Sequence, residues 1–308
     1  MRKIHSRITG LVCIASMCLL MFPNIAFGST SHVQQVLEKN STYEGFLSSG
    51  ETLSYEELLT LPGTSVRSEF ETIDEMKTMP NSELYKMGLS FEDVQVVKGE
   101  ETRNIILQHA ATLTNNELKE KGLSDETIQN IKEGNFENVT EYDVQRASSK
   151  LAFNIASVWR GGTSANYNIY WHWDVEPSLK YRDSITSAIS DGYHVNGTST
   201  ALLYYNDEAG VLEQTEKRKP PTQAHDGTCE FTFDMREYTE WGPRYCAAGK
   251  AFVATSTKDT SPDWALIASA DYYHSYQPEG FEISLTGGPI SVYGAGSHEG
   301  EATYYIDK

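Results

Sequence analysis

Cysteine is scarce in this sequence, with four residues in a chain of 308. Cys13 and Cys18 lie in a leading apolar segment, so only Cys229 and Cys246 remain for the folded part of the chain. Neither has a second cysteine at the spacing of a zinc site, so no metal site is predicted there. Because 16 residues separate them, the pair predicts one disulfide in an exported protein, which stabilises the fold by about 3 kcal/mol.

Long hydrophobic runs are also lacking, apart from one near the N-terminus. Three basic residues precede the apolar stretch Ile8–Phe22, and small residues follow at Ala26 and Gly28. This order is typical of a secretory signal peptide, predicted here as residues 1–28, and the stretch is shorter than the roughly 20 apolar residues of a membrane helix. We therefore expect a secreted, extracellular protein with no integral membrane segment after the signal is removed.

Basic residues are few, with 25 Lys and Arg against 43 Asp and Glu, which gives a formal net charge of −18. The predicted signal contains three of the basic residues and none of the acidic ones, so its removal leaves a net charge of −21. Such a charge repels nucleic acid and anionic membrane surfaces, and neither is an expected partner.

Motifs of known catalytic chemistry are missing. The sequence has no Gly-x-Ser-x-Gly turn for a nucleophilic serine and no Asp-x-Asp-x-Asp-Gly calcium loop. No catalytic residue, metal site or cofactor is therefore predicted, and the chain is expected to be non-enzymatic. A carboxylate pair for glycoside hydrolysis stays open, because the fold alone sets the distance between two such groups.

Tryptophan is absent from residues 29–150, where 22 acidic residues stand against 11 basic ones. Apolar positions at helical spacing predict a small all-helical domain over this segment. The motif of Glu83–Ser90 recurs 34 residues later at Glu117–Ser124. Thr114 and Glu117 match a capping box and Gly122 can end the helix, so each repeat predicts a helical hairpin, over residues 79–99 and 113–134.

The shared pattern is Glu-Leu-x-x-x-Gly-Leu-Ser-x-Glu/Asp-x-Ile/Val. It resembles the N-terminal region of a group of secreted proteins of Gram-positive bacteria. In those proteins a signal peptide and acidic helical repeats precede an aromatic-rich β region. The resemblance implies the same layout for this chain and brings neither an activity nor site residues.

Aromatic residues concentrate in the second half, where all five Trp and 14 of the 18 Tyr follow Lys150. About ten short strands separated by Gly, Pro and Asn turns predict an antiparallel β-sandwich or barrel over residues 151–308. The whole chain is therefore predicted to be α+β. One stretch, residues 179–189, has apolar residues at helical spacing and predicts a helix.

The strand predicted at the centre of this region is Asn168–Val175, which alternates strictly between apolar and polar residues. Trp171 and Trp173 should face the core, and the residues between them should face solvent. Adjacent tyrosines must also point to opposite faces, which predicts one exposed ring in each pair. Exposed Tyr and Trp beside polar groups suit stacking on sugar rings, so the candidate binding residues are Tyr170, His172, Asp174, Trp241 and Tyr245.

Two functions of different class follow from these observations. The first is a secreted, non-enzymatic protein whose β domain binds a carbohydrate or another cell-surface component. The alternative is a secreted membrane-acting toxin or antibacterial effector, because Ser/Thr-rich strands flank Lys258–Asp263 in the pattern of a hairpin that could refold. The helical segment is either a permanent spacer or a pro-segment, cleaved in an exposed linker that contains Arg146 and Lys150.

Overall fold

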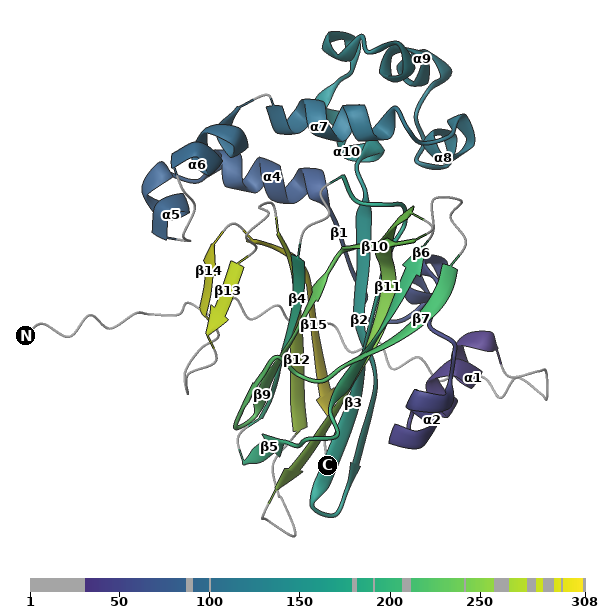
Figure 1. The fold of residues 1–308 in the computed structure, drawn as a ribbon, viewed down its shortest axis with the longest axis vertical. Helices are drawn as coiled ribbons and strands as arrows, with labels where there is room; N and C mark the ends of the chain where they lie inside the picture. Colours follow the sequence, from purple (N-terminus) through teal and green to yellow (C-terminus); the bar gives the residue numbers. More distant parts are fainter. Residues whose placement is uncertain are drawn as a thin grey trace, which may run out of the picture. The chain divides into compact units, whose positions relative to one another are not determined.

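Short α-helices and antiparallel β-sheets make up the chain, so the protein is α+β (Figure 1). The computed structural model describes residues 31–86, 91–99, 101–178, 182–190, 192–206, 212–240, 242–257, 266–275, 281–284, 291–294 and 296–306. Residues 32–308 form one compact unit. No helix within the described ranges is long and apolar enough to cross a membrane.

Most helices precede the second strand, and most strands follow Ser149. The helices are α1 His32–Lys39, α2 Tyr43–Ser48, α3 Tyr55–Leu59, α4 Glu69–Thr78, α5 Asn81–Lys86, α6 Phe91–Lys98, α7 Glu101–Ala110, α8 Asn115–Glu120, α9 Asp125–Glu133, the 3-10 turn η1 Phe136–Asn138, and α10 Glu141–Ala147. The strands are β1 Ser65–Ser68, β2 Lys150–Gly161, β3 Ser164–Trp173, β4 Arg182–Ile189, β5 Tyr193–Val195, β6 Thr200–Asn206, β7 Leu212–Lys219, β8 Gln223–His225, β9 Thr228–Asp234, β10 Arg236–Thr239, β11 Gly242–Thr257, β12 Leu266–Ser275, β13 Phe281–Ser284, β14 Ser291–Gly294 and β15 Gly296–Ile306.

Two antiparallel sheets enclose the main core. The larger sheet has eight described strands in the order β1-β2-β3-β11-β6-β7, with β5 and β10 also paired to β11. The smaller sheet has five described strands in the order β15-β12-β4-β9-β8. Trp171 from β3, Phe233 from β9 and Tyr272 from β12 all belong to the same core, so the β region is a two-layer sandwich.

Strand β3 lies in the middle of the larger sheet, between β2 and β11. Trp171 and Trp173 are fully buried in the main core, as the alternation predicts. Trp171 stacks on Phe233 with ring centroids 5.6 Å apart, and its indole lies over Gly249 of β11. A Cβ atom at Gly249 would lie 2.0 Å from Trp171 Cζ2, so only glycine fits opposite this ring.

Helices α1–α3 cover the opposite face of the larger sheet. Phe46 of α2 packs against Tyr204 and Phe252, with the Phe46 and Phe252 ring centroids 5.5 Å apart. Tyr204 therefore lies under these helices, while its neighbour Tyr205 lies in the main core. The prediction that one tyrosine of this pair is exposed is wrong, because the sheet is covered on both faces.

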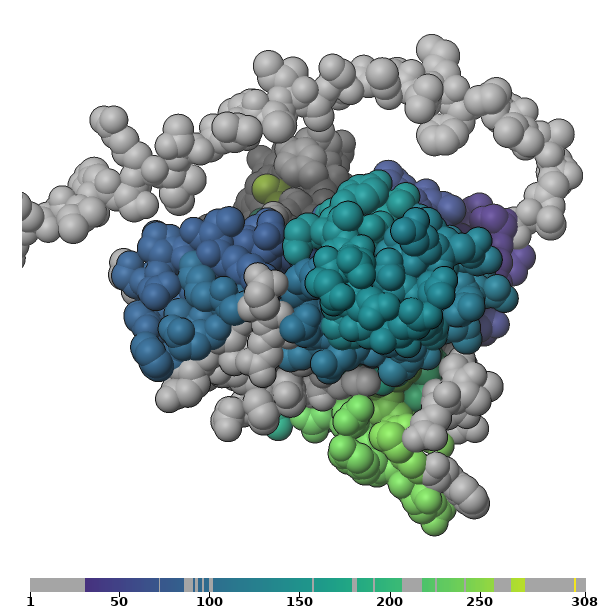
Figure 2. Space-filling model, turned by 90° about the horizontal axis from the view of Figure 1, so that it is seen from above, coloured from purple at the N-terminus to yellow at the C-terminus, as the bar shows by residue number. Residues whose placement is uncertain are grey.

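Helices α4–α10 contain the two stretches that repeat in the sequence, and they form most of the face seen from above in Figure 2 (blue to teal). The Lys98 ammonium donates to the carbonyls of Lys77 and Met79. Lys132 is 34 residues after Lys98, and it donates to the carbonyls of Ala111 and Leu113, which are 34 residues after Lys77 and Met79. The same contact between a lysine and two backbone carbonyls thus recurs in both stretches.

The N-terminal segment is not purely helical, because strand β1 lies between α3 and α4 and pairs with β2 in the larger sheet. The end of the segment also differs from the predicted exposed linker. Helix α10 reaches Ala147, β2 begins at Lys150, and the two serines between them are buried. The helices and the sheets are therefore parts of one compact unit rather than two domains joined by an open hinge.

The helix predicted over residues 179–189 is replaced by a strand. Residues 179–181 lie outside the described ranges, and β4 pairs with β9 on one side and β12 on the other. Ile185 and Ile189 of β4 face the main core. Residues four apart lie on the same face in a strand as well as in a helix, so the spacing does not distinguish the two. Hydrogen bonding to a neighbouring strand on both sides stabilises this segment as a strand.

The predicted disulfide is not formed, and Cys229 and Cys246 are both free and buried. Cys229 lies on β9 of the smaller sheet and Cys246 on β11 of the larger sheet. Burial raises the pKa of the Cys229 thiol to about 12 and raises that of Cys246 as well, so both thiols stay protonated. Sequence spacing sets the size of a loop, but it does not bring two Cα atoms within the reach of a disulfide.

Candidate functional site

The predicted outer residues of β3 lie on the sheet face that α1–α3 cover. Tyr170 is fully buried, and its hydroxyl accepts a hydrogen bond of 2.9 Å from Asn40 Nδ2. Burial raises the pKa of Tyr170, which keeps the phenol neutral. The prediction that Tyr170 faces solvent is wrong, because alternation tells which residues share a face and not what covers that face.

His172 and Asp174 are also engaged inside the protein. His172 Nδ1 donates to the carbonyl of Trp173 at 2.8 Å, and burial lowers the pKa of His172. Asp174 Oδ2 lies 2.6 Å from Lys121 Nζ, and Asp174 Oδ1 accepts from the amide of Lys150 at 2.8 Å. These contacts fix the turn after α8 against β2 and β3. The two residues therefore hold the fold together and do not form an open ligand site.

A buried lysine fastens the first two helices to the larger sheet. Lys250 of β11 donates to Asn40 Oδ1 and to the carbonyls of Ser49 and Glu51, each at 2.9 Å. Its Nζ lies 4.7 Å from the centroid of the Phe46 ring. Burial lowers the pKa of Lys250 to about 7, and its three acceptors match the three donors of an ammonium group. Both Lys250 and Asn40 are fully buried, so no solvent-borne ligand reaches them.

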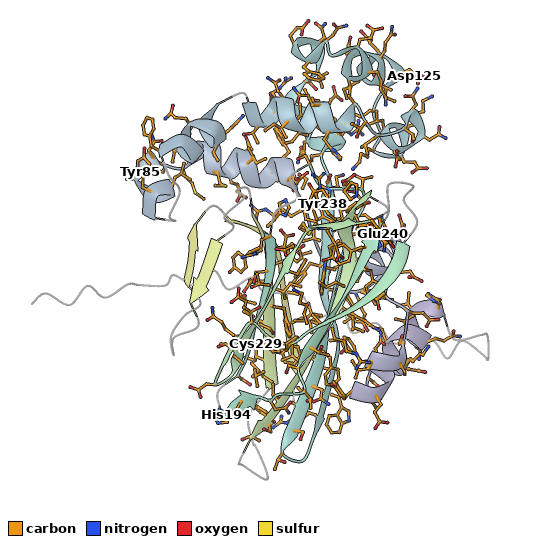
Figure 3. The ribbon with its side chains drawn as sticks, in the orientation of Figure 1. Tyr85, Asp125, His194, Cys229, Tyr238 and Glu240 are labelled. Atoms are coloured by element: carbon orange, nitrogen blue, oxygen red, sulfur yellow. The ribbon has the colours of Figure 1, made fainter. Side chains whose placement is uncertain are left out.

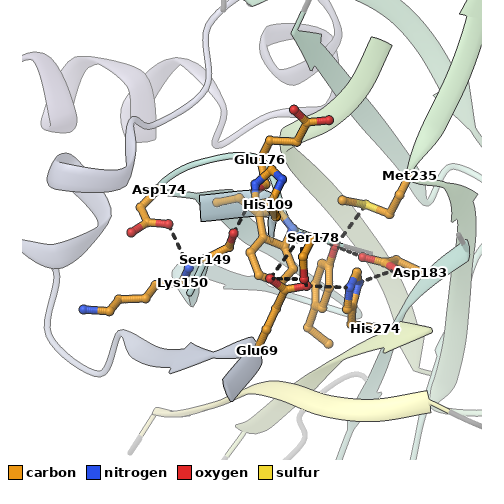
Figure 4. A network of polar contacts seen from close by, with 12 residues as sticks. Glu69, His109, Ser149, Lys150, Asp174, Glu176, Ser178, Asp183, Met235 and His274 are labelled. Carbon is orange, nitrogen blue, oxygen red and sulfur yellow. Dashed lines mark hydrogen bonds and ion pairs between the residues drawn. The ribbon is translucent and has the colours of Figure 1, made fainter. Parts of the chain in front are cut away.

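A second buried cluster joins helix α4 to the smaller sheet (Figure 4). His274 Nδ1 lies 2.8 Å from Asp183 Oδ1, and His274 Nε2 lies 3.6 Å from Glu69 Oε1. Ser178 donates from its amide and its hydroxyl to the Glu69 carboxylate at 3.0–3.1 Å. Tyr272 donates its hydroxyl to the second oxygen of Asp183.

The charges in this cluster follow from its contacts. Burial disfavours a charged imidazole, but Asp183 and Glu69 outweigh burial and raise the pKa of His274 well above its ordinary value. Burial also disfavours the Glu69 carboxylate, yet the contacts from His274 and Ser178 hold the pKa of Glu69 below its ordinary value. An imidazolium thus lies between two carboxylates.

Acid–base chemistry needs a substrate within hydrogen-bond reach of the titrating group. Glu69, Asp183 and His274 are buried, so this cluster acts as a joint between α4, β4 and β12 and not as an active site. Within the described ranges, no group of three or more His, Cys, Asp and Glu side chains is placed to hold a metal ion.

The remaining two predicted binding residues are Trp241 and Tyr245. Trp241 lies outside the described residues, and Tyr245 belongs to the ribbon formed by β10 and β11. Tyr245 is partly buried, and its hydroxyl accepts a hydrogen bond of 2.8 Å from Asn206 Nδ2. Burial raises the pKa of Tyr245 to about 12. Of the five predicted residues, Tyr245 is the one that the structure places beside an exposed aromatic ring.

That ring is Tyr238, which the sequence reasoning missed. Arg236 lies opposite Tyr245 and Tyr238 lies opposite Pro243, so these four residues share one side of the ribbon, called here the ribbon face. Tyr238 is 76% exposed, the highest value among the large hydrophobic side chains of the described residues, and Figure 3 labels it. The Arg236 guanidinium lies 5.9 Å from the centroid of the Tyr238 ring. The alternation Arg236-Glu237-Tyr238, shortly before Gly242-Pro243, was the signal that could have located both residues.

Comparisons with known proteins give no identity for the chain. No protein-family model matches it, and no curated protein matches it. Solved structures similar to about half of the chain include the collagen-binding domain of a Staphylococcus aureus adhesin, at 7% identity and a TM-score of 0.27, covering 49% of this chain and 97% of that one. The major pilin subunit of Bacillus cereus is another, at 9% identity and a TM-score of 0.27, covering 49% of this chain and 40% of the pilin chain. At these TM-scores the likeness assigns neither a fold family nor a function.

Proposed function

We propose that the protein is a secreted, non-enzymatic binding protein that holds a carbohydrate of a cell surface on its ribbon face. The observation that carries this proposal is the exposed Tyr238 ring beside the Arg236 guanidinium. A tyrosine offers a flat apolar surface for the face of a sugar ring and a hydroxyl for its edge. The arginine supplies several fixed donors for the acceptors of hydroxyl or carboxylate groups.

The partly buried neighbour Tyr245 supports the same surface. Its hydroxyl is held by Asn206, so the ring is fixed before any ligand arrives. Preorganised aromatic side chains bind with a smaller loss of conformational entropy than mobile ones. The net charge of −21 that remains after removal of the signal disfavours a polyanionic ligand, so neutral or basic glycans are the favoured class.

Export is part of the proposal, because the leading segment has the order of a signal peptide. The layout shared with secreted Gram-positive proteins is in keeping with this location. Residues 29–150 are proposed to remain in the mature protein as a permanent part of it. Their helices supply Phe46 to the larger sheet and Glu69 to the buried cluster, and a detachable pro-segment would leave both contacts open.

The alternative of a membrane-acting toxin rested on a hairpin around residues 258–263. The two strands on either side, β11 and β12, pair in different sheets and so do not form a hairpin together. Residues 258–263 themselves lie outside the described ranges. No feature of the described residues favours this alternative.

A glycan array probed with the mature protein tests the proposal. Tyr238→Ala should weaken binding to the retained glycan by roughly tenfold or more, because it removes the exposed ring and leaves the core untouched. Tyr142→Ala is the matched control, because Tyr142 is 63% exposed and also lies beside an arginine, Arg146, but on helix α10. Absence of any retained glycan, or equal loss in both variants, would refute the proposal.

A further inference from the structure

The two helical hairpins have the same architecture. The first hairpin, α5 and α6, begins at residues 81 and 91, and the second, α8 and α9, begins at residues 115 and 125, an offset of 34 in each case. Their buried apolar residues also correspond. Leu84, Val94 and Val97 of the first hairpin occupy the positions of Leu118, Ile128 and Ile131 in the second.

One difference between the exposed surfaces of the two hairpins concerns a pair of positions, one on each helix. In the second hairpin, Lys119 Nζ lies 2.8 Å from Asp125 Oδ1 in an exposed ion pair. The corresponding residues of the first hairpin are Tyr85 and Phe91, which are 43% and 63% exposed. Figure 3 labels Tyr85 and Asp125, each on the outside of its hairpin. The first hairpin therefore carries two exposed aromatic side chains at the positions that the ion pair occupies in the second hairpin.

We propose that Tyr85 and Phe91 form a docking site for a Lys- or Arg-rich segment of another protein. The second hairpin has the same fold with an ordinary ion pair at these positions, so the fold itself does not require aromatic residues there. Two exposed rings on one small hairpin provide anchors of the kind that dominate protein interfaces. Their faces attract ammonium and guanidinium groups, and their area packs against the aliphatic stems of the same side chains.

The charge around the pair selects this partner. Residues 70–100 contain seven acidic and three basic side chains, and the ammonium of one of those three, Lys98, is directed to backbone carbonyls. A cationic segment would be attracted to this surface. A second copy of the chain, a nucleic acid or an anionic membrane would be repelled by the net charge of −21 of the mature protein. This docking site is separate from the ribbon face and does not depend on it.

The test exchanges the pair between the hairpins. The probe is a fluorescent synthetic peptide of alternating lysine and leucine, titrated with the full mature protein and followed by anisotropy. Y85K/F91D gives the first hairpin the surface of the second and should weaken binding by about tenfold. K119Y/D125F gives the second hairpin the aromatic pair and should add a second binding site per molecule. Neither exchange alters the net charge, so a change in affinity reports on the rings and not on the overall field.

Several outcomes would overturn the proposal. They are failure of the wild-type protein to bind the peptide, equal binding by Y85K/F91D, and equal binding of a peptide with glutamate in place of lysine. Sedimentation that reveals self-association lost in Y85K/F91D would identify a second copy as the occupant and would equally reject a cationic partner. If Y85K/F91D does not fold, the single variants Y85A and F91A carry the test, since exposed side chains tolerate truncation.

Discussion

Replacing His274 by alanine is the sharpest test of how the helical and β parts are held together. The imidazolium lies between the buried carboxylates of Glu69 and Asp183. Without it, Tyr272 would still donate to Asp183 and Ser178 would still donate to Glu69. The two buried carboxylates would lose the positive charge that lies between them.

The cost follows from the burial of all three groups. Removing one partner of a buried charge cluster typically destabilises a protein by about 3–5 kcal/mol, out of a total stability of about 5–15 kcal/mol. The wild-type contribution also depends on pH. Because the pKa of His274 is raised in the folded state, the stabilisation is complete below the unfolded pKa of about 6.5 and is lost as the pH rises through the folded pKa.

Urea unfolding followed by tryptophan fluorescence measures this loss, with circular dichroism as a second probe. The ring of Trp173 lies 5.2 Å from that of His274, so the fluorescence reports on the cluster directly. His194→Ala is the control, because His194 is exposed beside Asp226 and should cost under about 0.5 kcal/mol. Two results would refute the role given to His274. One is an equal loss of stability in the two histidine variants, and the other is a His274→Ala variant that still loses stability as the pH rises.

Three further predictions concern the core and the helical cover. Gly249→Ala should destabilise the fold by about 1–3 kcal/mol or more, because the added Cβ would overlap the Trp171 ring, and denaturant midpoints would measure it. Cys229 and Cys246 should react with a thiol reagent only in denaturant, and the intact mass should be the same with and without reductant; a mass difference of two hydrogens would contradict this. Lys250→Met should expose helices α1 and α2 to protease while the sheets stay folded, since Asn40 Oδ1 and the carbonyls of Ser49 and Glu51 lose the ammonium that donates to them.

Local patterns in the sequence predicted the parts of the fold that local physics decides. The alternation over residues 168–175 placed Trp171 and Trp173 in the core, where both lie. The capping box of Thr114 and Glu117 starts α8, with both hydrogen bonds formed. In each case the residues that make the contact are near each other in the chain, so their spacing carries the information.

Contacts between distant segments decided the rest. Tyr170 was expected in solvent because nothing in its strand indicates that Asn40, 130 residues away, closes over it. Glu69 and His274 come from opposite ends of the described chain, and neither neighbourhood predicts a shared buried site. Tyr238 became a candidate only when the pairing of β10 with β11 placed it on one face with Tyr245.

The affinity of one glycan for a Tyr238 series tests the central claim most directly. Calorimetric titration of the mature protein should give similar dissociation constants for wild type and Tyr238→Phe, because both keep the ring, and a value roughly tenfold weaker for Tyr238→Ala. Identical dissociation constants for all three proteins would contradict a binding site on the ribbon face.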